Sequence, residues 1–230
     1  MHPFTDRSEA GRVLAPLLST YAHRDDVVVL GLPRGGVPVA FEVAQYLGVT
    51  LDVLIVRKLG APLQPEFALG AIASGGVVVM NPHAHSWVDQ GAIKQAIIEQ
   101  RLEIERREKT YRSGRAPANI YGRIAILVDD GAATGSSMLA AVRAARRLGA
   151  KETVVAVPVA SEDAYQSLRR EASHVVCIGT PEGFAAVGQY YLDFGQTTDE
   201  EVIDLLTRAH APKVAAGPQT RSQPSHQVRQ

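Results

Sequence analysis

Two adjacent acids and a turn of small and hydroxyl residues stand together near the middle of the chain. Apolar residues Ala125–Val128 come first, Asp129 and Asp130 follow, and Gly131–Ser137 leads into an amphipathic stretch. This order is typical of a buried parallel strand that ends at a loop and a helix N-terminus. Carboxylates accept hydrogen bonds from sugar hydroxyls, whereas the amides and hydroxyls at a helix start suit a phosphate. The combination therefore predicts a site for a ribose phosphate.

A second glycine-rich turn follows another apolar run, Val27–Leu30, and has the sequence Gly-Leu-Pro-Arg-Gly-Gly over residues 31–36. The backbone amides of Arg34, Gly35 and Gly36 could form a nest for an anion, and the Arg34 guanidinium adds positive charge. Glycine also lets the backbone approach a ligand closely. Taken alone, the same residues favour an ordinary tight turn.

The run from Asp129 to Ser137 resembles the signature with which type I phosphoribosyltransferases bind phosphoribosyl pyrophosphate: apolar strand, two acids, small residues, Thr-Gly and a hydroxyl. The glycine turn resembles the pyrophosphate loop of this family, so we expect a strained or cis peptide at Leu32–Pro33 or Pro33–Arg34. The resemblance implies that Asp129 and Asp130 hold the ribose hydroxyls. It assigns the 5′-phosphate to Ala133, Thr134, Gly135, Ser136 and Ser137, and the pyrophosphate to Pro33, Arg34, Gly35, Gly36, Arg57 and Lys58.

The catalytic groups implied by the resemblance are Asp129, Asp130, Arg34 and Lys58. Arg57 and Lys58 follow a third predicted strand, Thr50–Val56, and ligands bind at the carboxyl ends of strands in open α/β sheets. We therefore expect both cations beside the diphosphate, although a solvated strand end would also explain Arg57.

An irregular, aromatic segment at residues 180–196 is expected to form a hood over the acceptor, because the resemblance implies one near the end of the chain. Tyr190, Tyr191 and Phe194 could stack on an aromatic base there. Packing of the same rings over the sheet edge is the alternative.

The reaction implied is transfer of phosphoribose from phosphoribosyl pyrophosphate to a nitrogenous, base-like acceptor, with Mg²⁺ as cofactor. The ion is expected on substrate and water rather than in a direct protein site, with Asp129 and Asp130 as candidate contacts. Members that use 6-oxopurines carry a third acid before the Thr-Gly, where this chain has Ala133, which disfavours hypoxanthine or guanine and leaves the acceptor open. A homodimer is an open expectation, since family members are often dimers.

The main alternative is a non-catalytic regulatory protein that binds phosphoribosyl pyrophosphate or a nucleotide. Such a regulator normally has a DNA-binding domain or a broad basic surface, whereas this chain has 24 basic and 24 acidic residues and no obvious helix-turn-helix. The balanced charge also argues against a nucleic-acid or membrane partner. A single cysteine, Cys177, and the lack of a membrane-spanning run or a signal-peptide core favour a soluble, cytoplasmic protein.

The elements that position these motifs alternate between short apolar strands and amphipathic helices, which predicts an α/β fold with a doubly wound, mainly parallel sheet flanked by helices. We expect a single domain over residues 1–209. Helices are predicted at residues 8–22 with Ser8 as N-cap, after Gly36, at 86–112 with a Ser86–Asp89 capping box, and at 136–148, 162–170 and 198–209. Strands are predicted at residues 26–32, 50–56, 125–128, 153–159 and 174–178.

Residues 59–122 are too many for one crossover and are expected to form an inserted helical hairpin or hood element. Within them we predict a β-hairpin around Gly75–Gly76 and a mobile loop at Pro62–Glu66, with Glu66 near the ribose or exposed to solvent. From His210 to Gln230 the apolar content falls and Pro, Gln, Ser and Gly dominate, which predicts a disordered tail.

Overall fold

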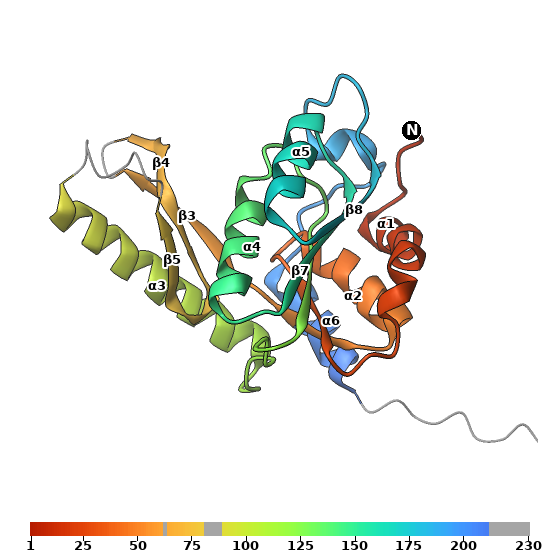
Figure 1. Cartoon of the computed structure of the whole chain (residues 1–230), viewed down its shortest axis with the longest axis horizontal. Helices are drawn as coiled ribbons and strands as arrows, with labels where there is room; N and C mark the ends of the chain where they lie inside the picture. Colours follow the sequence, from red (N-terminus) through yellow and green to blue (C-terminus); the bar gives the residue numbers. More distant parts are fainter. Residues whose placement is uncertain (62–63, 81–88, 212–230) are drawn as a thin grey trace, which may run out of the picture.

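The structure, a computed structural model, describes residues 1–61, 64–80 and 89–211, with the backbone alone described at residues 61 and 64–68. Its centre is a parallel sheet of five strands in the order β2-β1-β6-β7-β8 (Figure 1). The strands are β1 (Val27–Gly31), β2 (Thr50–Val53), β6 (Ile124–Val128), β7 (Glu152–Val159) and β8 (His174–Gly179). The prediction of a doubly wound parallel sheet is confirmed.

Helices cover both faces of this sheet, which explains why its central strands β1 and β6 contain no polar side chain. Alternate residues point to opposite faces. Val27 and Val29 of β1 join a core with α1 (Arg7–Leu14), the 3-10 helix η1 (Ala15–Tyr21), α2 (Gly36–Leu47) and α6 (Asp199–His210). Val28 and Leu30 join the core on the other face, with α4 (Ser136–Arg147) and α5 (Glu162–Glu171).

The inserted region forms an arm that projects from the main sheet (Figure 1). It consists of an antiparallel sheet of β3 (Val56–Ala61), β4 (Gln64–Ala73) and β5 (Val77–Met80), with the long helix α3 (Gln90–Arg112) packed against it. The prediction of a helical hairpin is therefore wrong, because three strands accompany one helix. The β-hairpin around Gly75–Gly76 is confirmed: both glycines have positive φ in the short 3-10 turn η2 (Ser74–Gly76) between β4 and β5.

The predicted mobile loop at residues 62–66 is only partly covered, since residues 62–63 lie outside the described residues and residues 64–66 belong to strand β4. The Glu66 side chain is likewise outside the described part of the chain. Near the end of the chain α6 begins with the expected Thr198–Glu201 capping box and continues to His210. The remainder of the predicted tail, residues 212–230, lies outside the described residues.

Two predicted helix starts differ from the structure. The first helix is capped by Asp6, whose carboxylate accepts from the Glu9 amide at 2.7 Å, and it changes to 3-10 geometry just before Pro16, which cannot donate a backbone hydrogen bond. Ser8 is therefore not the cap. The long helix α3 is capped by Asp89, whose carboxylate accepts from the Ala92 amide, whereas Ser86 lies outside the described residues. None of the helices in the described ranges is long and apolar enough to cross a membrane.

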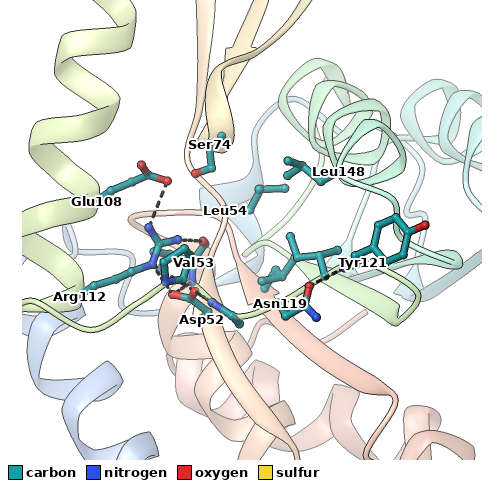
Figure 2. A pocket seen from close by; sticks show the side chains of 14 residues that line it. Asp52, Val53, Leu54, Ser74, Glu108, Arg112, Asn119, Tyr121 and Leu148 are labelled. Atoms are coloured by element: carbon teal, nitrogen blue, oxygen red, sulfur yellow. Dashed lines mark hydrogen bonds and ion pairs between the residues drawn. The ribbon is translucent and has the colours of Figure 1, made fainter.

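A buried ion pair fastens the end of α3 to the edge strand β2 (Figure 2). The Arg112 guanidinium donates from Nε to Asp52 at 3.0 Å and from Nη2 to the Val53 carbonyl at 3.0 Å, and Glu108 lies 3.1 Å from Nη1. Asp52 also accepts from the Ala118 amide at 2.8 Å. The side chains of Arg112 and Asp52 are 9% and 7% exposed, so their polar groups depend on these partners.

A cavity of about 430 Å³ lies beside this ion pair (Figure 2). Its wall includes Leu54, Ser74, Tyr121 and Leu148, and it contains none of the residues assigned to phosphoribosyl pyrophosphate. The charged side chains that reach it, Asp52, Glu108 and Arg112, are already paired with one another. The cavity therefore lies between the main sheet and the arm, away from the two motifs.

Candidate functional site

The candidate site lies where the winding of the sheet reverses. From β1 the chain moves through α2 to β2 on one side, whereas β6, β7 and β8 follow on the other. In such a sheet a crevice opens between the carboxyl ends of the two strands at the reversal, here β1 and β6. Gly31 pairs in register with Val128, and the Leu32 amide donates to the Val128 carbonyl at 2.9 Å. The two motifs found in the sequence are thus neighbours in space.

The glycine turn after β1 packs directly against the acid pair. A Cβ atom on Gly36 would lie 2.6 Å from the Val128 carbonyl oxygen and 2.8 Å from the Asp129 Cα. A Cβ atom on Gly35 would collide with the Asp130 carboxylate. Close approach of the two backbones therefore requires glycine at position 36, and the Asp130 carboxylate fills the space that a side chain at position 35 would need. The Pro33–Arg34 peptide bond is cis, at one of the two places where a strained or cis peptide was expected.

We predict that Gly36→Ala lowers the free energy of unfolding by about 1–3 kcal/mol, because the added methyl group must displace backbone atoms rather than a flexible side chain. Chemical denaturation would measure the change. Gly91→Ala in α3 is the matched control, since its Cβ would meet only the end of the Asp89 side chain. That variant should change stability by less than about 1 kcal/mol, and an equal loss in both variants would contradict the packing argument.

The two carboxylates of the pair have different partners. Asp129 Oδ1 accepts from the Asp130 amide at 2.9 Å, whereas Asp130 Oδ2 accepts from Arg7 Nε at 2.8 Å. Burial raises the pKa of Asp129 well above its ordinary value, and the neighbouring charge of Asp130 acts in the same direction. Burial also raises the pKa of Asp130, against the opposing effect of the Arg7 hydrogen bond. Donors from a ligand would stabilise the ionised form of both acids.

The turn after the acids presents an open helix N-terminus. Helix α4 starts at Ser136 directly after Gly135, which has a φ of 70°. Ala133, Thr134 and Ser136 are exposed, and the hydroxyls of Thr134 and Ser136 lie 3.0 Å apart. Free amides at a helix start, together with hydroxyl groups, form a suitable site for a phosphate.

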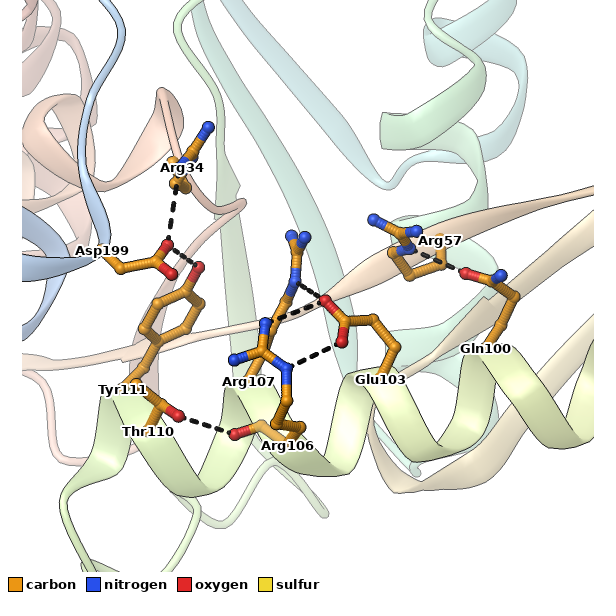
Figure 3. A network of polar contacts seen from close by, with 9 residues as sticks. All are labelled: Arg34, Arg57, Gln100, Glu103, Arg106, Arg107, Thr110, Tyr111 and Asp199. Atoms are coloured by element: carbon orange, nitrogen blue, oxygen red, sulfur yellow. Dashed lines mark hydrogen bonds and ion pairs between the residues drawn. The ribbon is translucent and has the colours of Figure 1, made fainter.

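Arg34 lies in a polar network that extends to the inserted helix (Figure 3). Its Nη1 atom is 3.6 Å from Asp199 Oδ1, at the start of α6, and the Tyr111 hydroxyl of α3 donates to the same oxygen at 2.7 Å. Burial, reinforced by this hydrogen bond to Asp199, raises the pKa of Tyr111 to about 12. The network therefore attaches the diphosphate candidate Arg34 to both α6 and α3.

Arg57 and Lys58 occupy a different place from the one expected. The predicted strand of residues 50–56 is interrupted after Val53, so both cations lie in β3 of the arm and not at the carboxyl end of a strand of the main sheet. Arg57 Nε donates to Gln100 of α3 at 2.9 Å, and Lys58 is exposed (Figure 3 shows Arg57). The expected placement is wrong, and contact of either residue with the diphosphate stays a prediction.

The aromatic segment near the end of the chain packs against the acid pair. The Tyr191 residue is 6% exposed, its ring lies 5.6 Å from the Phe4 ring, and its hydroxyl donates to the Asp130 carbonyl at 2.6 Å. It is therefore a core residue and is not available to stack on a base. Tyr190 stacks on Phe184 at 5.3 Å, and Phe194 carries the Arg7 guanidinium 4.0 Å from its ring centre. Contact of Tyr190 or Phe194 with an acceptor stays a prediction.

Arg7 is the site residue that sequence reasoning missed. It belongs to the first turn of α1, whereas the sequence predicts a helix only from residue 8 and assigns it no chemical role. Its partner Asp130 is 123 positions away in the chain. No local pattern of residues indicates such a contact, so only the fold reveals it.

Known proteins resemble this chain over most of its length. The family of phosphoribosyl transferase domains matches residues 8–194. Proteins from two strains of Mycobacterium tuberculosis, CDC 1551 and H37Rv, each described provisionally as a phosphoribosyl transferase, are 48% identical over 219 residues. These matches cover 94% of this chain and 49% of each relative, so the chain spans about half the length of the curated relatives it matches.

A solved structure agrees with the fold described above. The protein TT1426 from Thermus thermophilus is 48% identical to this chain, with a TM-score of 0.80. The superposition covers 90% of this chain and 99% of that one. The region that matches the family includes both motifs of the crevice, because it extends from residue 8 to residue 194. The chain belongs to the family of phosphoribosyl transferase domains.

Proposed function

We propose that this protein transfers phosphoribose from phosphoribosyl pyrophosphate to a nitrogenous, base-like acceptor and releases pyrophosphate. The observation that carries this proposal is the convergence of three binding elements on one crevice. These elements are the glycine turn after β1, the acid pair after β6 and the N-terminus of α4. Each suits a different part of the same substrate: diphosphate, ribose hydroxyls and 5′-phosphate.

In the proposed reaction a nitrogen of the acceptor forms a bond to the anomeric carbon, and the bond from that carbon to the diphosphate oxygen breaks. Asp129 and Asp130 would accept hydrogen bonds from the ribose hydroxyls and so fix the sugar. The N-terminus of α4 would anchor the 5′-phosphate, which converts remote binding energy into orientation of the reacting carbon.

Negative charge grows on the diphosphate as it leaves. The Arg34 guanidinium and the amides of Arg34 and Gly35 would face that charge as fixed donors, an arrangement that stabilises a transition state effectively. The Gly36 amide already donates to the Leu32 carbonyl at 3.0 Å. The present partner of Arg34 is Asp199, at 3.6 Å and with a side chain 35% exposed. Since an exposed pair of this length is weak, a diphosphate could replace Asp199 as the partner of Arg34.

The residues present fit Mg²⁺ carried by the substrate. In the described ranges there is no group of three or more acidic, histidine or cysteine side chains that could hold a metal ion, and the acid pair supplies carboxylate oxygens of the kind that Mg²⁺ accepts. Asp129 and Asp130 would hold the ion together with substrate oxygens and water. Bound there, Mg²⁺ would neutralise charge on the diphosphate.

A steady-state assay of pyrophosphate release tests the proposal. The protein would be mixed with phosphoribosyl pyrophosphate, Mg²⁺ and, in turn, each of a panel of purine, pyrimidine and other nitrogenous heterocycles. We expect turnover with at least one of them. Tight binding of phosphoribosyl pyrophosphate without turnover on any acceptor would contradict transfer and would favour a binding protein instead.

The role of α4 can be tested separately with Ser136→Glu. A carboxylate at this helix start would repel the 5′-phosphate and occupy its donors, so we expect the affinity for phosphoribosyl pyrophosphate to fall by about 100-fold. Titration calorimetry would measure it. Thr207→Glu, which adds the same charge on an exposed face of α6, is the control and should leave the affinity unchanged. Equal affinities in the two variants would contradict the proposal that the N-terminus of α4 binds the 5′-phosphate.

A further inference from the structure

A single carboxylate oxygen connects the glycine turn of the crevice to the arm (Figure 3). Asp199 Oδ1 accepts the Tyr111 hydroxyl of α3 at 2.7 Å and lies 3.6 Å from Arg34 Nη1. The first distance is that of a good hydrogen bond, whereas the second is too long for one. Because Tyr111 is fully buried, its hydroxyl holds the Asp199 carboxylate in a fixed place. The ion pair between Asp199 and Arg34 is therefore long and weak.

The charge of Asp199 does not depend on Arg34 alone. Asp199 is the first residue of α6, and the positive end of a helix stabilises a carboxylate there. The Tyr111 hydroxyl adds a hydrogen bond to the same charged group. Since these two sources of stabilisation would stay in place, Asp199 should lose Arg34 to another anion at little cost.

Two further arginines of α3 lie around Tyr111 and Asp199 (Figure 3). Arg106 and Arg107 both donate from Nε to Glu103, at 2.8 and 2.6 Å. These hydrogen bonds lower the pKa of Glu103 to about 2, so it is ionised and balances part of their charge. Among the described residues, Arg34 is therefore the cation that pairs with Asp199 within 4.0 Å.

We propose that Tyr111 and Asp199 are positioning residues that set how tightly Arg34 holds a diphosphate. Asp199 competes with the diphosphate for Arg34, and Tyr111 weakens that competition because it holds Asp199 too far away for a hydrogen bond. The affinity for diphosphate thus depends on the arm, to which Tyr111 belongs. This inference rests on the proposed function, because it concerns the diphosphate role of Arg34.

Replacement of the two residues should have opposite effects. Asp199→Asn keeps an oxygen that accepts from Tyr111 but removes the competing charge, so the affinity for pyrophosphate should rise about fivefold. Tyr111→Phe removes the hydroxyl that restrains Asp199, which can then approach Arg34, so the affinity should fall about threefold. A purely structural role of the two residues would instead weaken binding in both variants.

Titration calorimetry of the full chain with inorganic pyrophosphate and Mg²⁺ would measure these changes. Asp204→Asn is the control for charge, because Asp204 lies on the same helix, pairs with Arg208 and has a side chain 61% exposed. Tyr46→Phe is the control for the hydroxyl, because Tyr46 is exposed on α2. Both controls should leave the affinity unchanged. Thermal unfolding would show that each variant keeps the fold, and Asp199→Asn carries the comparison if Tyr111→Phe does not fold.

Two further measurements isolate the part played by Arg34. In an Arg34→Met background, Asp199→Asn should change the affinity by less than about twofold, because no guanidinium is left for which the two anions compete. Nitrogen-15 NMR of the ligand-free protein should show the guanidinium protons of Arg34 exchanging with water faster in Asp199→Asn than in wild type. The same protons should exchange more slowly than in wild type in Tyr111→Phe.

The outcomes separate this inference from the proposed function. A fall in pyrophosphate affinity in Asp199→Asn, or a rise that persists in full in the Arg34→Met background, would overturn the inference. Failure of the wild-type protein to bind pyrophosphate would overturn it together with the diphosphate role of Arg34. Absence of turnover with every acceptor, with the opposite changes in pyrophosphate affinity present, would contradict transfer and leave the inference standing.

Discussion

Replacement of both Asp129 and Asp130 by asparagine is expected to lower the affinity for phosphoribosyl pyrophosphate by about 1,000-fold. Hydrogen bonds to charged groups contribute about 1.5–3 kcal/mol each, and two of them together correspond to about three powers of ten. The amides keep the shape of the carboxylates, so the change removes charge and acceptor strength rather than volume. Titration calorimetry with Mg²⁺ present would measure the loss.

The chain contains a matched control for this variant. Asp25 and Asp26 form another adjacent pair of acids, at the opposite, amino end of β1, where Asp26 pairs with Arg24 at 2.8 Å. Asp25→Asn with Asp26→Asn makes the same change in charge away from the crevice and should leave the affinity unchanged. Full affinity in the Asp129 and Asp130 double variant would contradict the assignment of the ribose to this strand end.

The negative charge of Asp129, which is proposed to favour ribose binding, should lower the stability of the folded protein. Burial and the Asp130 charge raise the pKa of Asp129, so the folded protein holds this proton more tightly than the unfolded chain does. A raised pKa means that ionisation costs stability as the pH rises above the ordinary value of about 4. Asp129→Asn should therefore be more stable than wild type at pH 8, by an amount that decreases as the pH is lowered. Urea denaturation at a series of pH values would measure the difference.

The second large effect is expected at the buried ion pair between the arm and the main sheet. Arg112→Met should lower the free energy of unfolding by about 3–5 kcal/mol, because it leaves the Asp52 carboxylate buried without its cation. Asp52 would keep only the amide hydrogen bonds from Val53 and Ala118, at 2.8 Å each. Urea denaturation would measure the loss.

Arg106→Met is the control on the same helix, since Arg106 pairs with Glu103 at 2.8 Å but its side chain is 57% exposed. An exposed pair of this kind contributes about 0–1 kcal/mol. Arg112→Met combined with Asp52→Ala should lose less than the sum of the single variants, as expected for residues in direct contact. Strict additivity would contradict the pairing.

The ion pair between Arg112 and Asp52 should also affect the candidate functional site, because it holds the end of α3 in place. The preceding residue, Tyr111, is fully buried and binds Asp199, the partner of Arg34. Loosening of α3 should therefore disturb Arg34 as well as the arm. A variant that is still folded at low temperature would be expected to bind pyrophosphate more weakly than wild type.

The sequence by itself determined the central sheet and the two motifs of the crevice. The strands β1 and β6 are buried on both faces, so each contains an unbroken apolar run, and the first residue after the run is Gly31 in one strand and Asp129 in the other. The caps of α5, at Ser161, and α6, at Thr198, depend on hydrogen bonds within three residues. Features of this kind are local and can be predicted without the fold.

The tertiary structure decided where the candidate residues Arg57 and Lys58 lie. The run Leu51–Val56 is almost entirely apolar, and hydrophobicity does not show that the chain leaves the main sheet within it. The Leu54 amide still bonds to Gly31, whereas the Ile55 amide bonds to Ser74 of the arm. Because this exchange of partners involves residues distant in sequence, Arg57 and Lys58 could not be placed correctly from the sequence alone.

The partners of the acid pair were likewise decided by the fold. Arg7 and Tyr191 reach Asp130 from positions 123 and 61 residues away, and neither is distinguished by its sequence neighbours. An aromatic ring near a site can stack on a ligand or fill the core, and only packing against Phe4 and Asp130 shows that Tyr191 does the latter. The sequence thus identified the candidate groups, and the packing of distant segments determined their partners and positions.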